Sequence, residues 1–228
     1  MSHEGSDGLT FAFVDLAGFT ALTEVHGDHD AADLIDHFGT LARDALDADD
    51  RIVKTIGDAV MLACLTPSAG LRLVRRITAA CLTQPRFPVP RAGLHHGPAV
   101  ERHDDFVGAA VNLAARVTAQ ATEATAVVTA TIEPAARQLG WSIAPLGYRL
   151  LHNLSEPVEL WEIPLDERYE RIGIDPVCRM RVTPDQVLAQ IRYHEIQYQF
   201  CSLGCASAFI AAPERYSAAS ATCPPARK

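Results

Sequence analysis

The sequence predicts an α/β or α+β fold around a mostly antiparallel sheet, with a small cysteine-containing unit near its C-terminal end. Two observations lead to this prediction. Short apolar runs alternate with segments in which apolar residues recur every three or four positions, as strands and helices do. Three of the six cysteines, Cys178, Cys201 and Cys205, also fall close together, outside the alternating part of the chain.

The composition limits the classes of partner and compartment. The chain has 228 residues, with 28 acidic and 20 basic side chains and a formal charge of -8. This acidic balance gives no general attraction for DNA or anionic lipid, so we expect no nucleic-acid partner. No apolar stretch approaches the roughly 20 residues of a membrane span, and no basic region followed by an apolar core opens the sequence. We expect a cytoplasmic protein, without membrane contact, whose cysteines are reduced.

The first predicted elements are a strand and an amphipathic helix. Leu9–Leu16 is a short apolar run that ends near Gly18, which is typical of a buried strand passing into a turn. Asp15 stands near the end of this strand. Apolar residues then recur at helical spacing over Ala31–Ala48, with Asp30 placed to cap the start of the helix.

A hairpin, a helix and a further strand are expected next. Arg51–Leu65 consists of two apolar runs joined at Gly57 and Asp58, a pattern typical of a hairpin. Gly70–Leu82 has a helical apolar face, and Arg91–His95 begins another strand. The remaining predicted elements are helices at Ala109–Ala121 and Ile132–Leu139 and strands at Ala126–Ala130, around Tyr148–Leu151 and at Val158–Ile163.

These patterns divide the chain into a main domain over 1–165, a charged connector over 166–173, a small unit over 174–217 and a tail over 218–228. The tail is low in complexity and is predicted to be disordered. The small unit has too few residues for a conventional core, and a bound metal would compensate for that shortage.

Three segments of the main domain together resemble the catalytic domain of class III nucleotidyl (adenylate and guanylate) cyclases. They are FAFVDLAGFTAL (11–22), IVKTIGDAVMLA (52–63) and RAGLHHGPAVERHDDFVGAAVNLAARV (91–117), and LHNLSEPVELWEI (151–163) resembles the closing strands. The resemblance implies a ferredoxin-like βαββαβ core. No P-loop and no dinucleotide-binding motif is present in the sequence.

Asp15 and Asp58 fall on the two metal-binding aspartates of the family. The resemblance implies that they hold two Mg(II) or Mn(II) ions, which activate the ribose hydroxyl of ATP and neutralise its triphosphate. Backbone N–H groups around Phe19 and Thr20 would form a phosphate cradle at a helix start. The alternative is that Asp15 caps a helix and Asp58 is only a turn residue.

Lys54 and Asp105 align with the pair that reads the base in the family. An ammonium donates to adenine N1 and a carboxylate accepts from its 6-amino group, whereas guanine presents the opposite pattern at both atoms. The pair therefore favours ATP. Alternatively, Lys54 is a surface lysine and Asp105 one of several loop acids, with Asp104 beside it as an ambiguity of alignment.

Asn112 and Arg116 stand four residues apart and are expected on one helix face. By resemblance, Asn112 positions the ribose and Arg116 stabilises charge on the phosphoryl group. A buried Asn112 without a partner would be costly, which argues against a purely structural role. In the family the metal aspartates and these residues come from different subunits at one site, so a homodimer is expected.

The segments DPVCRM (175–180), YHEIQYQFCSLGC (193–205) and AFIAAPERY (208–216) resemble the YHS domain, related to TRASH-type metal modules. Cys178, Cys201 and Cys205 suit Zn(II) or Cu(I), with His194, water or nothing as a fourth ligand. Arg179 stands where the family commonly has glycine. The alternative is three reduced thiols in a small aromatic core.

Other histidines receive structural interpretations. His95 and His96 are read as structural. The group His26, Asp28, His29 and Asp30 resembles a metal site, but a solvated helix entry is the favoured interpretation.

The sequence as a whole predicts an adenylate cyclase with a metal module that regulates it. The alternatives are a catalytically idle scaffold that serves the metal module, and a guanylate cyclase.

Overall fold

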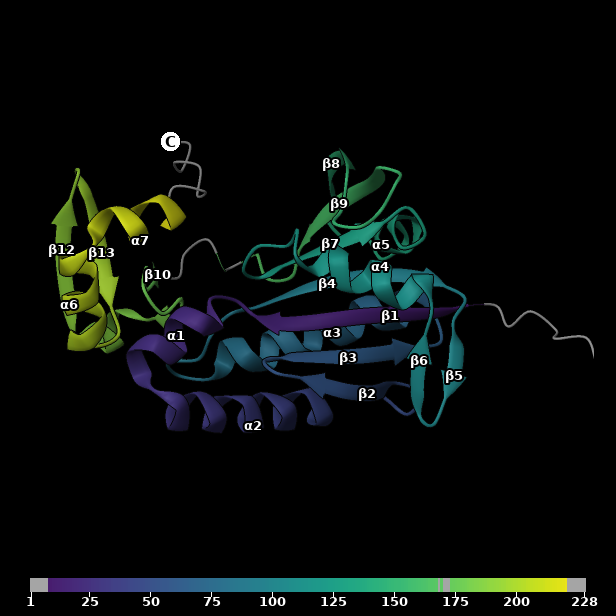
Figure 1. Cartoon of the computed structure of the whole chain (residues 1–228), viewed down its shortest axis with the longest axis horizontal. Helices are drawn as coiled ribbons and strands as arrows, with labels where there is room; N and C mark the ends of the chain where they lie inside the picture. The colour runs from purple at the N-terminus through teal and green to yellow at the C-terminus, as the bar shows by residue number, and fades with distance from the viewer. Residues whose placement is uncertain (1–7, 168, 170–172, 221–228) are drawn as a thin grey trace, which may run out of the picture.

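A computed structural model gives the fold of residues 8–167, 169 and 173–220 (Figure 1). The first part has a βαββαβ order, with two consecutive helices in its first crossover. Its elements are β1 (Leu9–Leu16), α1 (Phe19–His26), α2 (Asp28–Asp44), β2 (Arg51–Ile56), β3 (Ala59–Cys64), α3 (Pro67–Thr83) and β4 (Pro90–Gly97). The second part adds β5 (Val100–Arg102), β6 (Asp105–Val107), α4 (Ala109–Thr118), β7 (Thr125–Thr129), α5 (Glu133–Gln138), β8 (Ala144–Arg149) and β9 (Val158–Pro164).

A seven-stranded sheet in the order β2-β3-β1-β4-β7-β9-β8 forms the centre of the main domain. Every pairing is antiparallel except that of β4 with β7. The sub-order β2-β3-β1-β4 is the ferredoxin-like arrangement, which confirms the predicted mostly antiparallel α/β fold. β1 lies between β3 and β4, and this inner place explains why its residues are almost all apolar.

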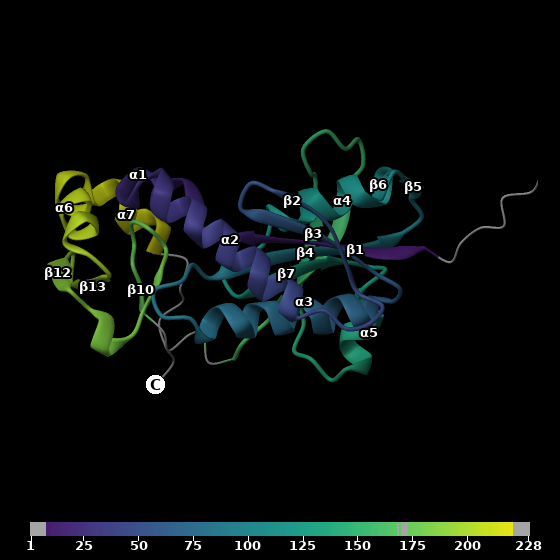
Figure 2. The same cartoon turned by 90° about the horizontal axis from the view of Figure 1, so that it is seen from below.

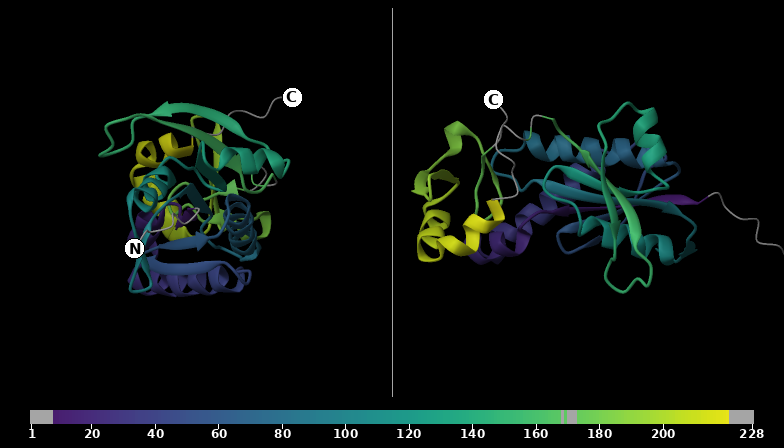
Figure 3. Two further views of the ribbon diagram at one scale, coloured as in Figure 1. Left: turned by 90° about the vertical axis from the view of Figure 1, so that its right-hand side faces the viewer. Right: turned by 90° about the horizontal axis from the view of Figure 1, so that it is seen from above.

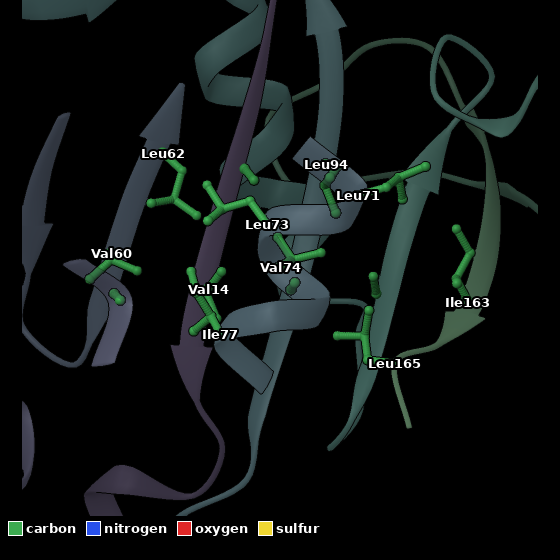
Figure 4. Packing of buried hydrophobic residues seen from close by; sticks show 14 of the residues in the cluster. Val14, Val60, Leu62, Leu71, Leu73, Val74, Ile77, Leu94, Ile163 and Leu165 are labelled. Carbon is green, nitrogen blue, oxygen red and sulfur yellow. The ribbon is translucent and has the colours of Figure 1, made fainter. Parts of the chain in front are cut away.

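Helices cover both faces of the sheet, and successive side chains of β1 point alternately into the hydrophobic core on one face and the core on the other. Val14 and its neighbours on that face pack against α2, α3 and α5. Figure 4 shows this packing, with Val60 and Leu62 of β3 beside Leu73 and Ile77 of α3. Phe11, Phe13 and Asp15 alternate with those residues and share the opposite face, where the two phenylalanines pack against α4. Figure 2 shows α3 and α4 on opposite sides of the sheet.

Helix boundaries differ from the predicted ones for local reasons. α2 starts at Asp28 after Gly27, and Asp30 lies inside its first turn, so the predicted cap at Asp30 is wrong. α3 starts at Pro67 because the Thr66 hydroxyl caps it, accepting from the Ala69 N–H at 3.2 Å.

The predicted helix over Ala109–Ala121 also ends early. α4 stops at Thr118, and the residues after it continue with i→i+3 backbone bonds of 3.0 and 3.1 Å.

The C-terminal unit lies at one end of the main domain, beside α1 (Figures 1 and 3). It consists of β10 (Gly173–Ile174), β11 (Arg181–Val182), the 3₁₀ helix η2 (Pro184–Gln186), β12 (Ala189–Tyr193), β13 (Ile196–Phe200), α6 (Leu203–Ala211) and α7 (Pro213–Ser220). Leu22 and Ala31 of the main domain share one buried cluster with Phe200 and Phe209 of this unit. Helices α1 and α2 therefore complete the small core.

The described residues also bear on the predicted boundaries. The unit begins with β10 at Gly173 and its last helix reaches Ser220, so residues 218–220 of the expected tail are helical. Residues 168 and 170–172 of the expected connector and residues 221–228 of the tail lie outside the described residues. Within the described part of the chain, no helix has both the length and the apolar character that crossing a bilayer requires.

Candidate active site and cysteine cluster

Two aspartates meet where β1 ends and β3 begins. Asp15 is near the end of β1, where it pairs in register with Ala59 of β3, and Asp58 occupies the β2–β3 turn. Gly57, at φ 60°, allows that tight turn. Burial raises the pKa of Asp58 to about 6, and a hydrogen bond with Asp15 and the charge of Asp15 act in the same direction. Two carboxylates in this arrangement suit hard divalent cations.

Arg91 supplies positive charge next to these carboxylates. It is the cross-strand neighbour of Asp15 on β4, and its Nε and Nη2 donate to Asp15 Oδ2 at 3.0 and 2.7 Å. Both side chains are partly buried, so the pair is stronger than a fully solvated one. Sequence reasoning missed Arg91, although the register of β1 and β4 places it there.

The start of α1 borders the same space. A hollow of about 490 Å³ is lined by Asp15, Gly18, Phe19, Thr20, Ala21, Glu24, Asp58, Arg91 and Arg215. Gly18 precedes the helix in a left-handed conformation, and free N–H groups of a first helical turn can bind anions. Phe19 packs into the core, so its backbone is the part that suits a phosphate. Arg215 comes from α7 of the C-terminal unit and pairs with Glu24 at 3.2 Å.

Lys54 and Asp105 already contact each other. Lys54 Nζ lies 2.6 Å from Asp105 Oδ2, and this hydrogen bond lowers the pKa of Asp105. The neighbouring Asp104 pairs instead with Arg51, at 3.5 Å. The geometry thus distinguishes the two acids that the sequence left as alternatives and joins Lys54 to Asp105.

Asn112 and Arg116 lie on α4, as expected, and Asn112 is exposed. The argument that a buried Asn112 would be costly therefore does not apply, because α4 covers the sheet with its other side. Arg116 Nε donates to the His152 carbonyl at 2.6 Å and Nη1 donates to the Asn112 carbonyl at 3.1 Å.

The predicted site residues therefore fall into separate groups within one chain. Asp15 and Asp58 line the hollow. The other four predicted site residues, which the structure also describes, do not line it: Lys54, Asp105, Asn112 and Arg116.

The three cysteines of the C-terminal unit converge, and a histidine joins them. Cys178 Sγ lies 3.4 Å from Cys201 Sγ, which lies 3.8 Å from Cys205 Sγ. His26 Nε2 lies 3.8 Å from Cys201 Sγ and 3.6 Å from Cys205 Sγ. Within the described residues these four form the one cluster of at least three such side chains whose donor atoms all lie within 4.8 Å.

The histidine differs from the expected one. His194, an expected candidate for the fourth ligand, is exposed in the β12–β13 turn. The interpretation of a solvated helix entry is wrong for His26, which ends α1 beside the three cysteines. It holds for Asp28, His29 and Asp30, which are exposed. No sequence pattern links His26 to cysteines so far along the chain.

A buried carboxylate orders the cysteine loops. Asp175 is 0% exposed and accepts hydrogen bonds from the backbone N–H groups of Val177 at 2.8 Å, Cys178 at 3.3 Å and Cys201 at 2.8 Å. It thus ties together the two segments that carry Cys178 and Cys201.

Comparison with known families assigns the main domain and the C-terminal unit to one family each. Residues 1–148 match the model of the adenylate and guanylate cyclase catalytic domain. The chain belongs to this cyclase family. Residues 173–220 match the YHS domain, so the cyclase carries a C-terminal YHS domain.

Curated relatives are similar over the cyclase part. The pH-sensitive adenylate cyclase of Mycobacterium tuberculosis is 36% identical over 165 residues, which are 70% of this chain and 41% of the relative. An adenylate cyclase of Streptomyces coelicolor is 32% identical over 111 residues, 48% of this chain and 29% of the relative. The chain thus matches less than half the length of these relatives.

Solved structures share the fold. Adenylate cyclases of Trypanosoma brucei in their monomeric state superpose with a TM-score of 0.64 at 20% identity, covering 72% of this chain and 92% of theirs. The adenylyl cyclase CyaB of P. aeruginosa superposes with a TM-score of 0.56 at 20% identity, covering 68% of this chain and 93% of its own.

Proposed function

We propose that this cyclase converts ATP to cAMP and pyrophosphate at sites formed between two copies of the chain. The observation that carries the proposal is the meeting of Asp15 and Asp58 at one hollow with the first turn of α1. The hollow combines carboxylates for cations with N–H groups for phosphate, which is what a nucleoside triphosphate with its metal ions requires. The named adenylate cyclases among the relatives support this choice of reaction.

Asp15 and Asp58 would hold two Mg(II) or Mn(II) ions. Such ions activate the ribose 3′-hydroxyl and neutralise the triphosphate. Burial and the neighbouring Asp15 raise the pKa of Asp58, and Arg91 offsets part of the negative charge of the two carboxylates. The N–H groups at Phe19 and Thr20 would receive the phosphates.

Lys54 and Asp105 would select adenine. The ammonium donates to N1 and the carboxylate accepts from the 6-amino group. In the free chain each group satisfies the other at 2.6 Å, so an adenine must replace that bond with two of its own. Guanine presents a donor to Lys54 and an acceptor to Asp105, and both contacts would be repulsive.

A homodimer would bring the separate groups together. Asp15 and Asp58 of one subunit would face Asn112 and Arg116 of the other, with Asn112 on the ribose and Arg116 on the phosphoryl group.

Exposed apolar side chains support this arrangement because they lie beside the predicted site residues. Ile56 is 50% exposed two residues after Lys54, and Val107 is 60% exposed two residues after Asp105. Leu150 is 69% exposed, close to the loop carbonyl of His152 that holds Arg116. A second copy would cover them.

The test is turnover of ATP and of GTP with Mn(II), with Asp58→Asn as the matched inactive control. Production of cAMP from ATP, lost in the control, is expected. Faster cyclisation of GTP would favour guanylate cyclase, and no product from either nucleotide would favour a catalytically idle scaffold.

We also propose that the YHS domain regulates the cyclase, because its helix α7 brings Arg215 to the hollow. The test compares cyclase rates with and without added zinc or copper, in the wild type and in Cys201→Ala. Identical rates under every condition would end this part of the proposal.

A further inference from the structure

The cysteine cluster lies at the boundary between the two domains, and one of its members belongs to the cyclase. His26 is the last residue of α1, whereas Cys178, Cys201 and Cys205 belong to the YHS domain. We propose that His26 is the fourth ligand of a tetrahedral Zn(II) site, so that a single ion joins the cyclase domain to the YHS domain.

The spacing of the donor atoms supports four-coordinate zinc. With Zn–S bonds of about 2.3 Å and Zn–N bonds of about 2.0 Å, the edges of a tetrahedron measure about 3.5 to 3.8 Å. Four of the six donor–donor edges run from 3.4 Å, between Cys178 and Cys201, to 3.8 Å, between His26 Nε2 and Cys201, and all six lie within 4.8 Å. A disulfide would need about 2.05 Å between two sulfurs, so none of the three cysteines is paired in this way.

The direction of His26 follows from how α1 packs. Leu22 stands one turn before His26 on the same face, is 0% exposed and belongs to the core shared with the YHS domain. Gly27, at φ 87°, then turns the chain into α2 and leaves His26 at the helix end, toward the thiols. All three cysteines are 0% exposed.

The YHS side of the cluster is equally fixed. Cys201 and Cys205 flank the start of α6, one turn apart, and Ser202 caps that helix by accepting from the Cys205 N–H at 3.0 Å. Arg86 of the cyclase domain donates to the Cys201 carbonyl at 3.1 Å. The ligands therefore sit on helices and turns of both domains that are held by their own hydrogen bonds.

The two ends of α1 then have different roles, one at the hollow and one at the zinc site, and the role at the hollow rests on the proposed function. The helix has eight residues and is about 12 Å long. Its first turn borders the hollow of Asp15 and Asp58, and its last residue ligates zinc. Zinc would thereby fix the helix that presents N–H groups to the triphosphate.

The experiment measures metal binding by the full chain, independently of turnover. Wild type, His26→Ala and His29→Ala are stripped with a chelator and titrated with Co(II) and then Zn(II). His29 is the matched control because it is exposed nearby on α2. Wild type and His29→Ala should bind one ion with the intense visible bands of tetrahedral Co(II), whereas His26→Ala should bind at least about tenfold more weakly with altered bands. Added imidazole should restore the wild-type spectrum of His26→Ala by filling the open position.

Identical affinity and spectra in all three proteins would overturn the assignment of His26. X-ray absorption on the Zn(II)-loaded wild type provides a test that requires no variant. Three sulfurs and one imidazole are expected, and a shell without imidazole scattering would refute the proposal even if His26→Ala failed to fold. Because neither measurement uses ATP, an inactive cyclase would leave this result intact.

Discussion

Mixing two inactive variants tests whether each active site is shared between two chains. Asp58→Asn removes a carboxylate from the hollow, and Arg116→Ala removes the cation on α4, so each variant alone should lose about 100-fold to 1000-fold in rate. In a symmetric dimer one subunit supplies Asp58 and the other Arg116 to each site. A mixed dimer then has one site with both defects and one intact site. Equal mixing makes about half of the dimers mixed, so activity should recover to about a quarter of the wild-type value.

The structure makes both variants suitable for this assay. Asp58 already has a raised pKa because burial and Asp15 disfavour its charge, so an uncharged amide should not destabilise the turn. Arg116 lies on α4, and its guanidinium donates at the protein surface to the backbone carbonyls of His152 and Asn112. The rate of cAMP formation is measured after co-refolding, with two affinity tags to count mixed dimers. The control mixes Asp15→Asn with Asp58→Asn, which damage the same half and should not recover. If mixed dimers form and the first mixture also stays near the level of its parents, the shared site is refuted.

Three further outcomes are expected. Lys54→Glu should lower kcat/KM for ATP by about 100-fold or more, because it places a second carboxylate beside Asp105. An unchanged ratio of kcat/KM for ATP to that for GTP would contradict the assigned base contact. Arg215→Ala should raise the KM for ATP about threefold through loss of a cation at the hollow. The exposed control Arg192→Ala should leave the KM unchanged. The same KM for Arg215→Ala and the wild type would show that Arg215 does not contact the substrate. Burial and the charge of His96 lower the pKa of His95 to about 4, so its contribution to stability is present above about pH 6.5 and is lost as the pH falls toward 4. His95→Asn should therefore reduce the loss of unfolding free energy between pH 7 and 5, measured in urea, by about 1 kcal/mol after allowance for partial exposure.

The sequence predicted features that depend on local patterns. The strand that carries Asp15 and the hairpin turn at Asp58 follow from apolar runs and from glycine at a turn, and both are present. Periodicity also located α4 and placed Asn112 and Arg116 on one face, but it could not fix where the helix ends, and α4 stops at Thr118. The contact of His26 with the cysteines depends on how two domains dock, which no local pattern encodes. The same holds for Arg215 at the hollow.

Arg179 stands where YHS domains commonly have glycine, and its contacts with the cyclase domain explain this difference. Its backbone lies at φ 59°, which glycine adopts freely and which costs another residue about 1 kcal/mol. Its Nε donates to Glu123 of the cyclase domain at 2.7 Å, and the two side chains are 16% and 18% exposed, so this ion pair is better shielded than a surface pair.

The stem of Arg179 also lies directly over Gly18, where any Cβ would overlap it. A glycine at position 179 would relieve the backbone but would lose both contacts with the cyclase domain. Since Gly18 precedes the first turn of α1 and His26 ends the helix, the YHS domain is attached at both ends of the same short helix. Arginine at 179 is therefore explained by attachment to the cyclase and needs no role in binding the metal.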